Sequence, residues 1–302
     1  MPVNDDLGKR MKEYYEQIPK TKLMRRTPVI IRIDGKAFHT FTKGFKRPFD
    51  EVLIKTMQET TKYLCENIQG CVLGYTQSDE ITLVLVDYKK FETSAWFDYE
   101  VQKMCSIAAS MATMAFNRIF QETIDLVFDE EVERRGLRKG TSFKDYSEGF
   151  DRLEEEFSIY YEKANKAMFD ARVFNIPKEE VTNCIYWRQL DASRNSIQMV
   201  GQANFSHKEL QNKSCSEIQD MLMLQKGINW NDLPTYQKRG SCVIKEPNFT
   251  QTSTIITPQP FGEPRIIAET QIHRSRWFID KEIPIFKGEG REYIEKLINV
   301  GE

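Results

Sequence analysis

The sequence predicts an α+β protein, and two observations lead to this prediction. Up to residue 177, short β-branched runs alternate with segments of helical periodicity in the order β-α-β-β-α-β. After that point the pattern changes to helical stretches and then to short β runs. We therefore expect an N-terminal domain over residues 1–177, interrupted by a helical insertion at about 121–170, and a mixed C-terminal region over 178–302 that packs on it.

The first expected elements are a helix, a strand and a second helix. Residues 3–18 place apolar side chains at helical spacing, namely Leu7, Met11, Tyr14, Tyr15 and Ile18. The run 29–33 is β-branched and of strand length, and it stops at Asp34-Gly35. Residues 50–68 repeat apolar positions every three or four residues, with Asp50 as the expected N-cap.

The next elements complete the domain. Two β-rich runs, 71–76 and 80–87, flank Gln77-Ser78-Asp79 and predict a hairpin. Residues 94–120 predict a long helix whose small side chains allow it to lie close against a sheet, and 172–176 supply a fourth strand. This order is the split arrangement of ferredoxin-like domains, in which the first and third strands are neighbours.

The C-terminal region predicts helices first and strands later. Helical stretches cover about 181–225, and Ser214 with Glu217 has the spacing of a capping box ahead of one of them. Beyond Gly240 short β runs dominate, and a closing helix is expected at 290–299. No internal repeat or low-complexity linker separates this region from the first.

Composition excludes several classes of protein. With 302 residues, 40% of them hydrophobic, the chain can bury a core without disulfides or a structural metal, and its six scattered cysteines predict reduced thiols. No apolar run approaches the roughly 20 residues of a membrane span, and the acidic start has no signal-peptide pattern, so we expect a cytoplasmic protein without a membrane partner. A net charge of −2 means that nucleic acid would be held by local basic patches.

Three acidic residues predict a metal site. Asp34 ends the first strand, and Asp79 and Glu80 lie in the hairpin expected beside it. Carboxylates gathered at one sheet edge repel each other unless cations neutralise them. Two magnesium ions would do so and could stabilise the attacking and leaving oxygens of phosphoryl transfer, as in a polymerase palm. We expect Asp34, Asp79 and Glu80 to be catalytic.

The segment that follows Asp34 predicts a nucleotide-binding loop. It begins with Gly35 and interleaves lysine, arginine and aromatic residues as far as Phe49, a composition that suits a triphosphate and its base. Strand alternation places Arg32 on the same side as Asp34, where it could brace that carboxylate or a phosphate.

Four motifs in order resemble those of the tRNA-histidine guanylyltransferase family. They are Arg32–His39, Gly74–Glu80, Phe169–Val173 and Tyr186–Gln189. The resemblance implies a palm-like domain that binds two Mg²⁺ ions through Asp34, Asp79 and the Gly35 carbonyl. It also implies that Lys36, Phe38 and His39 lie in the nucleotide loop and that Arg47 and Ser78 contact the triphosphate.

The resemblance implies a 3′-to-5′ nucleotidyltransferase that uses ATP, GTP and other nucleoside triphosphates to extend the 5′ end of tRNA. Ser193 stands where the eukaryotic branch has histidine, and the runs 194–199, 205–210 and 227–232 are similar to the bacterial and archaeal guanylyltransferase-like proteins. These favour template-dependent repair of truncated tRNA. The alternatives are addition of a single G to histidine tRNA, a palm-type nucleotide cyclase and a non-catalytic RNA-binding module.

Further residues are candidates for RNA contacts in the C-terminal region. His207, Lys208, Lys238 and Arg239 could grip phosphates, and Asn195 is expected to keep a family role. The family also implies a homotetramer, since tRNA needs more surface than one compact chain offers.

Overall fold

The structure is a computed structural model that describes residues 6–137, 143–257 and 265–300. Its strands are β1 (Val29–Gly35), β2 (Cys71–Gln77), β3 (Glu80–Leu85), β4 (Phe169–Asn175), β5 (Ser241–Thr257) and β6 (Arg265–Asp280). Its α-helices are α1 (Asp6–Met11), α2 (Phe38–Phe41), α3 (Glu51–Asn67), α4 (Val101–Arg134), α5 (Phe143–Lys163), α6 (Lys178–Asn204), α7 (His207–Leu210), α8 (Cys215–Lys226), α9 (Thr235–Arg239) and α10 (Glu292–Ile298). Shorter turns are a π-helix at Lys12–Glu16 and 3₁₀ turns at Trp96–Tyr99, Trp230–Asp232 and Gly288–Arg291.

The described strands form one sheet in the order β4-β1-β3-β2-β5-β6, and every neighbouring pair is antiparallel. The protein is therefore a mixed helix and antiparallel-sheet fold. The first and third strands are neighbours, as predicted, with Asp34 opposite Glu80 at the end of the pairing. Because β1 lies between β3 and β4 and is antiparallel to both, its last residues lie opposite the first residues of these two strands at one edge of the sheet.

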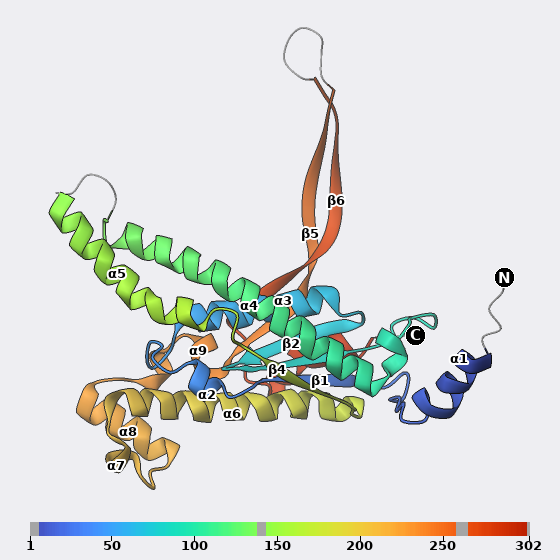
Figure 1. The fold of residues 1–302 in the computed structure, drawn as a ribbon, viewed down its shortest axis with the longest axis horizontal. Helices are drawn as coiled ribbons and strands as arrows, with labels where there is room; N and C mark the ends of the chain where they lie inside the picture. Colours follow the sequence, from blue (N-terminus) through green and yellow to red (C-terminus); the bar gives the residue numbers. More distant parts are fainter. Residues whose placement is uncertain (1–5, 138–142, 258–264, 301–302) are drawn as a thin grey trace.

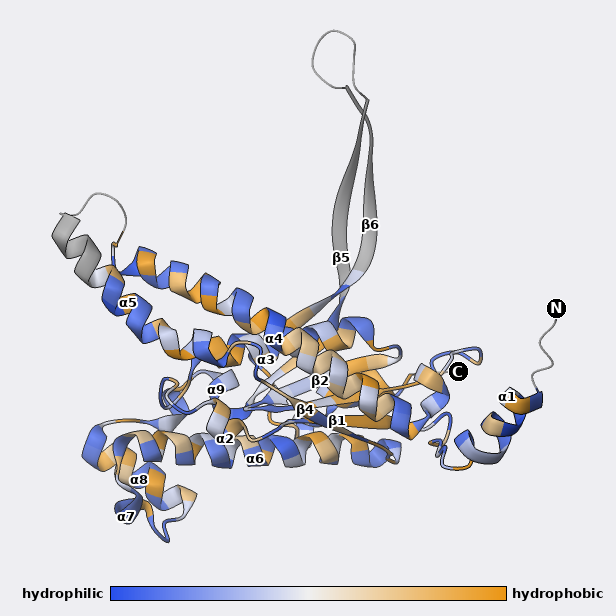
Figure 2. Cartoon of the chain, viewed as in Figure 1, coloured by the Kyte–Doolittle hydropathy of each residue, from blue (hydrophilic) through white to orange (hydrophobic). Residues whose placement is uncertain are grey.

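Helices cover both faces of the sheet (Figure 1). Val29, Ile31 and Ile33 point to the face covered by α3 and α4, whereas Ile30 joins a second core with residues of α6 and α10. The predicted alternation along β1 is thus confirmed, and it places Asp34 on the α6 face. Figure 2 shows the hydrophobic residues concentrated on the strands and on the helix sides that face them.

Two of the local capping signals predicted from the sequence are present in the structure. The Asp50 side chain accepts a hydrogen bond from the backbone N of Leu53 and caps α3, as predicted. The capping box of Ser214 and Glu217 is present at the start of α8. The helix predicted at 94–120 begins later and continues to Arg134, where it pairs with α5, so the insertion is helical.

The largest difference from the sequence prediction is the β5-β6 hairpin. Only Ser241 to Ile244 of β5 pair with β2, and beyond them the two strands pair with each other and project from the body (Figure 1). The sequence suggested short runs because Pro247 interrupts the pattern, and the register does shift there, between Glu246 and Phe249. The pairing then resumes.

The N-terminal helix forms but its apolar side chains stay exposed in the described structure. Leu7, Tyr15 and Ile18 are 62%, 64% and 75% exposed. None of the described helices has the length and apolar character required to cross a bilayer.

Candidate active site

Acidic side chains from three strands meet at one edge of the sheet. The backbone register pairs Asp34 with Glu80 on one side and with Asp170 on the other, so these three residues share a face. The hairpin turn brings Asp79 to the same place, because the Gly35 backbone N donates a hydrogen bond of 3.1 Å to the Asp79 carbonyl. Residues distant in sequence thus converge.

Burial and like charge make two of these carboxylates hard to ionise. Burial chiefly raises the pKa of Asp79 to about 6, with added repulsion from Asp34 and Glu80, although the Ser78 hydroxyl donates to its carboxylate at 3.0 Å. Burial, and then the charges of Glu80 and Asp170, raise the pKa of Asp34 as well. A cation placed between them would relieve this cost.

The charge of Glu80 differs from those of Asp34 and Asp79 in that two arginine side chains already balance it. Arg188, whose side chain is 6% exposed, donates to both Glu80 oxygens at 2.9 and 3.1 Å, and Arg32 lies 3.4 Å away. Arg32 therefore forms its ion pair with Glu80, and the arginine nearest to Asp34 is Arg172, at 3.9 Å. The expectation that Arg32 braces Asp34 directly is corrected in favour of Arg172.

Asp34 and Asp79, which we call the acid pair, suit Mg²⁺ better than they suit a metal that is bound by protein ligands alone. Within the described residues no group of three or more His, Cys, Asp and Glu side chains is arranged around a common point. Mg²⁺, however, is commonly bound by one or two carboxylates together with substrate phosphates and water. Asp34 and Asp79, both with raised pKa values, supply that partial set.

The loop after β1 has three buried aromatic residues, Phe38, Phe41 and Phe45, and several exposed polar ones. Phe38 is 4% exposed, and its ring packs on Phe41, Phe116 and Phe169 with centroids 4.9 to 5.5 Å apart. The Phe38 ring therefore belongs to the core, and the role of this residue in nucleotide binding remains a prediction. Exposed side chains in the loop are Lys36, His39 and Arg47, and their contacts with a triphosphate remain predictions.

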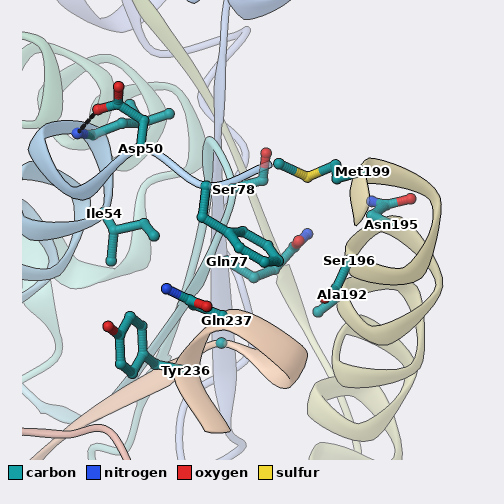
Figure 3. A pocket seen from close by; sticks show the side chains of 13 residues that line it. Asp50, Ile54, Gln77, Ser78, Ala192, Asn195, Ser196, Met199, Tyr236 and Gln237 are labelled. Atoms are coloured by element: carbon teal, nitrogen blue, oxygen red, sulfur yellow. Dashed lines mark hydrogen bonds between the residues drawn. The ribbon is translucent and has the colours of Figure 1, made fainter. Parts of the chain in front are cut away.

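A pocket opens beside the hairpin turn (Figure 3). Its apolar walls are Phe49, Leu53, Ile54, Ala192 and Met199, and its polar ones are Asp50, Gln77, Ser78, Asn195, Ser196, Tyr236, Gln237 and Gly240. Ser78 is the residue before Asp79, so the pocket adjoins the acid pair. An apolar cleft with a few amide groups suits a nucleobase.

Helix α9 closes this pocket. Tyr236 and Gln237 both donate to the Glu51 carboxylate at 3.2 Å, which ties α9 to the start of α3. The sequence analysis did not predict that Tyr236 and Gln237 line a pocket, because no local sequence pattern indicates it.

The predicted RNA contacts do not gather in one place. Asn195 lines the pocket beside Ser78, whereas His207 and Lys208 lie exposed at the start of α7. The Lys238 ammonium donates to the Asn231 carbonyl, and Arg239 follows it in α9. Their roles in RNA binding remain predictions.

Sequence reasoning also assigned no role to Asp170, Arg172, Trp187 or Arg188. All four stand in motifs that resemble the family, which was the available signal. The contacts of Arg172 with Asp34, of Trp187 with Arg32 and of Arg188 with Glu80 join residues more than 100 positions apart, however, so spacing could not reveal them.

Comparisons with known proteins identify the family of the chain. The family model described as Thg1, tRNAHis guanylyltransferase, matches residues 8–177. A solved structure of a bacterial tRNA(His) guanylyltransferase (Thg1)-like protein in complex with ATP is 40% identical, covers 97% of this chain and 98% of its own, and superposes with a TM-score of 0.71. A solved structure of a bacterial tRNA(His) guanylyltransferase (Thg1)-like protein in complex with GTP is 37% identical. It covers 97% of this chain and 99% of its own, with a TM-score of 0.68.

A relative from Schizosaccharomyces pombe named tRNA(His) guanylyltransferase is 25% identical over 255 residues, which cover 80% of this chain and 82% of that protein. The match of the family model to more than half of the chain, together with the 40% identity over nearly its whole length, shows that the chain belongs to the tRNAHis guanylyltransferase (Thg1) family, whose members are nucleotidyltransferases that act on tRNA.

Proposed function

We propose that this protein is a template-dependent 3′-to-5′ nucleotidyltransferase that activates and extends the 5′ end of truncated tRNA. In the first step the 5′-monophosphate of the RNA attacks the α-phosphate of ATP, which forms an adenylylated end and releases pyrophosphate. The 3′-hydroxyl of an incoming nucleotide then attacks the 5′-phosphate and expels AMP. Where the end already carries a triphosphate, pyrophosphate leaves instead.

The observation that supports this proposal most is the convergence of Asp34 and Asp79 beside the pocket of Figure 3. Two partly buried, mutually repelling carboxylates beside a cleft lined by apolar and amide groups are the arrangement that phosphoryl transfer with metal ions needs. The order β4-β1-β3-β2 also agrees with a ferredoxin-like, polymerase-like palm.

The protein's own residues have separate tasks in this proposal. Asp34 and Asp79, with the Gly35 carbonyl, would hold two Mg²⁺ ions, which when bound would neutralise phosphate charge and stabilise the attacking and leaving oxygens. Ser78 lines the pocket and hydrogen-bonds Asp79, so it orients that carboxylate. Glu80, paired with Arg188 and Arg32 at the start of β3, would assist the two aspartates in catalysis.

Two observations favour repair over addition of a single G. Ser193 replaces the histidine of the eukaryotic branch, and it lies on α6 between pocket residues Ala192 and Asn195. The chain is also 40% identical to a bacterial Thg1-like protein solved with ATP, against 25% for the yeast tRNA(His) guanylyltransferase. Residues 178–302 would contribute to tRNA binding, since α6 and α9 supply part of the pocket wall.

The test is incorporation of labelled nucleotides into a tRNA lacking its first 5′ nucleotides, with intact histidine tRNA as the comparison. We expect extension of the truncated tRNA that stops at full length and requires Mg²⁺. Asp34→Asn and Asp79→Asn should each lower the rate by at least about a hundredfold, with tRNA affinity largely retained.

Other outcomes would point to the alternatives. Addition of one G to intact histidine tRNA, without repair, would support the single-G activity. Nucleotide turnover without RNA would support a cyclase, and tRNA binding without any incorporation would support a non-catalytic module.

A further inference from the structure

A half-exposed tryptophan lies close to the acid pair. Trp187 on α6 is 53% exposed, although its indole is large and apolar. The Arg188 guanidinium lies 3.8 Å from its ring centroid and that of Arg32 lies 5.3 Å away. Since Arg32 also pairs with Glu80, only one side chain separates the indole from the acidic edge of the sheet.

A basic row borders the acidic row on the same face of the sheet. Arg32 pairs in register with Arg172, two residues along from the pairing of Asp34 with Asp170, and side chains two residues apart share a face. Arg172 is 56% exposed and reaches to within 3.9 Å of Asp34. Arg172 also donates to the Asp170 carboxylate at 3.3 Å, and the Arg32 side chain is only 16% exposed. Trp187 and Arg172 are therefore the exposed side chains of this region, and we call the group of Trp187, Arg32 and Arg172 the Trp187 surface.

The Trp187 surface is separate from the pocket of Figure 3. The pocket uses residues of α6 from Ala192 to Met199 together with the hairpin turn at Gln77 and Ser78. Trp187 precedes Ala192, the first pocket residue of α6, by five residues, about 7.5 Å along the helix axis. It contacts β1 rather than that turn. The acid pair thus lies near two different surfaces, the pocket and the Trp187 surface.

The proposed reaction joins two nucleotides, so it needs two such surfaces. The pocket is concave and lined by apolar and amide groups that suit a nucleobase, whereas the Trp187 indole is half-exposed, as contact with the end of a large RNA requires. Stacking on an aromatic ring tolerates any base, which suits 5′ ends of differing sequence. The positive charge of arginine side chains beside the ring is complementary to the negative charge of a 5′-phosphate.

We propose that Trp187 is the stacking platform for the base of the RNA's 5′-terminal nucleotide, with Arg172 facing its phosphate. Trp187 would position the RNA and would take no part in the chemistry. This inference rests on the proposed function, because it assigns the second substrate of that reaction.

The experiment uses a truncated tRNA that carries 2-aminopurine as its 5′-terminal base, titrated with the full-length protein without nucleoside triphosphate. The fluorescence of 2-aminopurine falls when it stacks on an aromatic ring. We expect strong quenching by the wild-type protein, weak quenching by Trp187→Leu, and most of the quenching restored in Trp187→Phe. Affinity for this tRNA should fall on the order of tenfold in Trp187→Leu.

The matched control is Phe91→Leu, which removes another exposed aromatic ring that lies under an arginine, 6.0 Å from Arg26, away from the acid pair. It should leave both quenching and affinity within twofold of wild type. ATP affinity, measured separately, should be unchanged in all three variants, because the pocket is a different site. A role of Trp187 only in supporting Arg32 and Glu80 would instead lower ATP affinity as well.

Equal quenching by wild type and Trp187→Leu would overturn the inference, and so would a parallel loss of ATP affinity. Failure of the proposed function is distinguishable, because it would appear as no extension of truncated tRNA by the wild-type protein. If the wild type extends tRNA but Trp187→Leu binds and quenches normally, the function stands and the platform does not.

Discussion

The ionised carboxylate of Asp79 destabilises the folded protein when no metal is bound. Burial, with the charges of Asp34 and Glu80, raises its pKa from 3.8 to about 6. A shift of that size corresponds to at most about 3 kcal/mol against the ionised form at neutral pH. The same feature that makes the site able to bind a cation therefore destabilises the empty fold.

We predict that Asp79→Asn stabilises the metal-free protein at pH 8 by roughly 1–3 kcal/mol, since it removes a buried charge and keeps an oxygen for the Ser78 hydroxyl. Thermal unfolding with EDTA should show a higher midpoint for the variant. Mg²⁺ with ATP should then raise the midpoint of wild type and leave that of the variant nearly unchanged. A variant less stable than wild type in EDTA would contradict this account.

Gly35 illustrates a steric requirement next to the acids. A Cβ at this position would lie 2.3 Å from Cδ2 of the Phe38 ring, which is held in the aromatic core. We predict that Gly35→Ala costs about 1–3 kcal/mol of stability, because the ring has little room to move.

The check on Gly35 is a double-mutant cycle followed by urea unfolding. In a Phe38→Leu background the cost of Gly35→Ala should be smaller, with a coupling of about 0.5 kcal/mol or more. Additive effects would mean that the clash with Phe38 is not the cause.

At the scale of elements, α8 depends on its capping box. Hydrogen bonds from the Ser214 backbone and hydroxyl, and the neighbouring Lys213, lower the pKa of Glu217 from 4.5 to about 2. Because the folded value lies below the unfolded one, the ionised carboxylate contributes stability fully above pH 4.5. That contribution is lost as the pH falls towards 2.

We predict that Glu217→Gln lowers the melting temperature at pH 6 and that its difference from wild type shrinks as the pH falls from 4.5 to 3. The measurement is thermal unfolding across this range, with Glu92→Gln in an exposed loop as the control. A difference that stays constant with pH would show that the charge of Glu217 is not involved.

At the scale of the whole molecule, the sheet is stabilised near its centre and the hairpin extends beyond it. Gln58 on α3 donates to the buried Ser241 hydroxyl at 2.7 Å, and Val243 joins the core under α3 and α4. Beyond Ile244 the described part of β5 pairs only with β6.

We predict that replacing residues 248–274 with an Asn-Gly turn leaves the body folded, because the pairing at 241–246 and 275–280 is kept. The melting temperature should change by no more than a few degrees, and the far-UV circular dichroism should lose only strand signal. Loss of cooperative unfolding would show that the projecting hairpin is part of the folding unit.

The sequence by itself determined the local structure and the order of the elements. Alternation along β1, the Asp50 cap and the capping box of α8 all depend on residues within a few positions of each other, so the signals are readable without the fold. The split strand order then predicted that Asp34 and Glu80 would be neighbours, as the register confirms.

Only the tertiary structure decided which side chains meet. Glu80 pairs with Arg188 across 108 residues, Phe38 turns into the core, and Trp187 stays exposed beside Arg32. The contacts of Arg188 and Trp187 depend on how α6 packs on the sheet and on which charged side chains form ion pairs there. Such contacts form between segments far apart in the chain, and their energies do not appear in any local pattern.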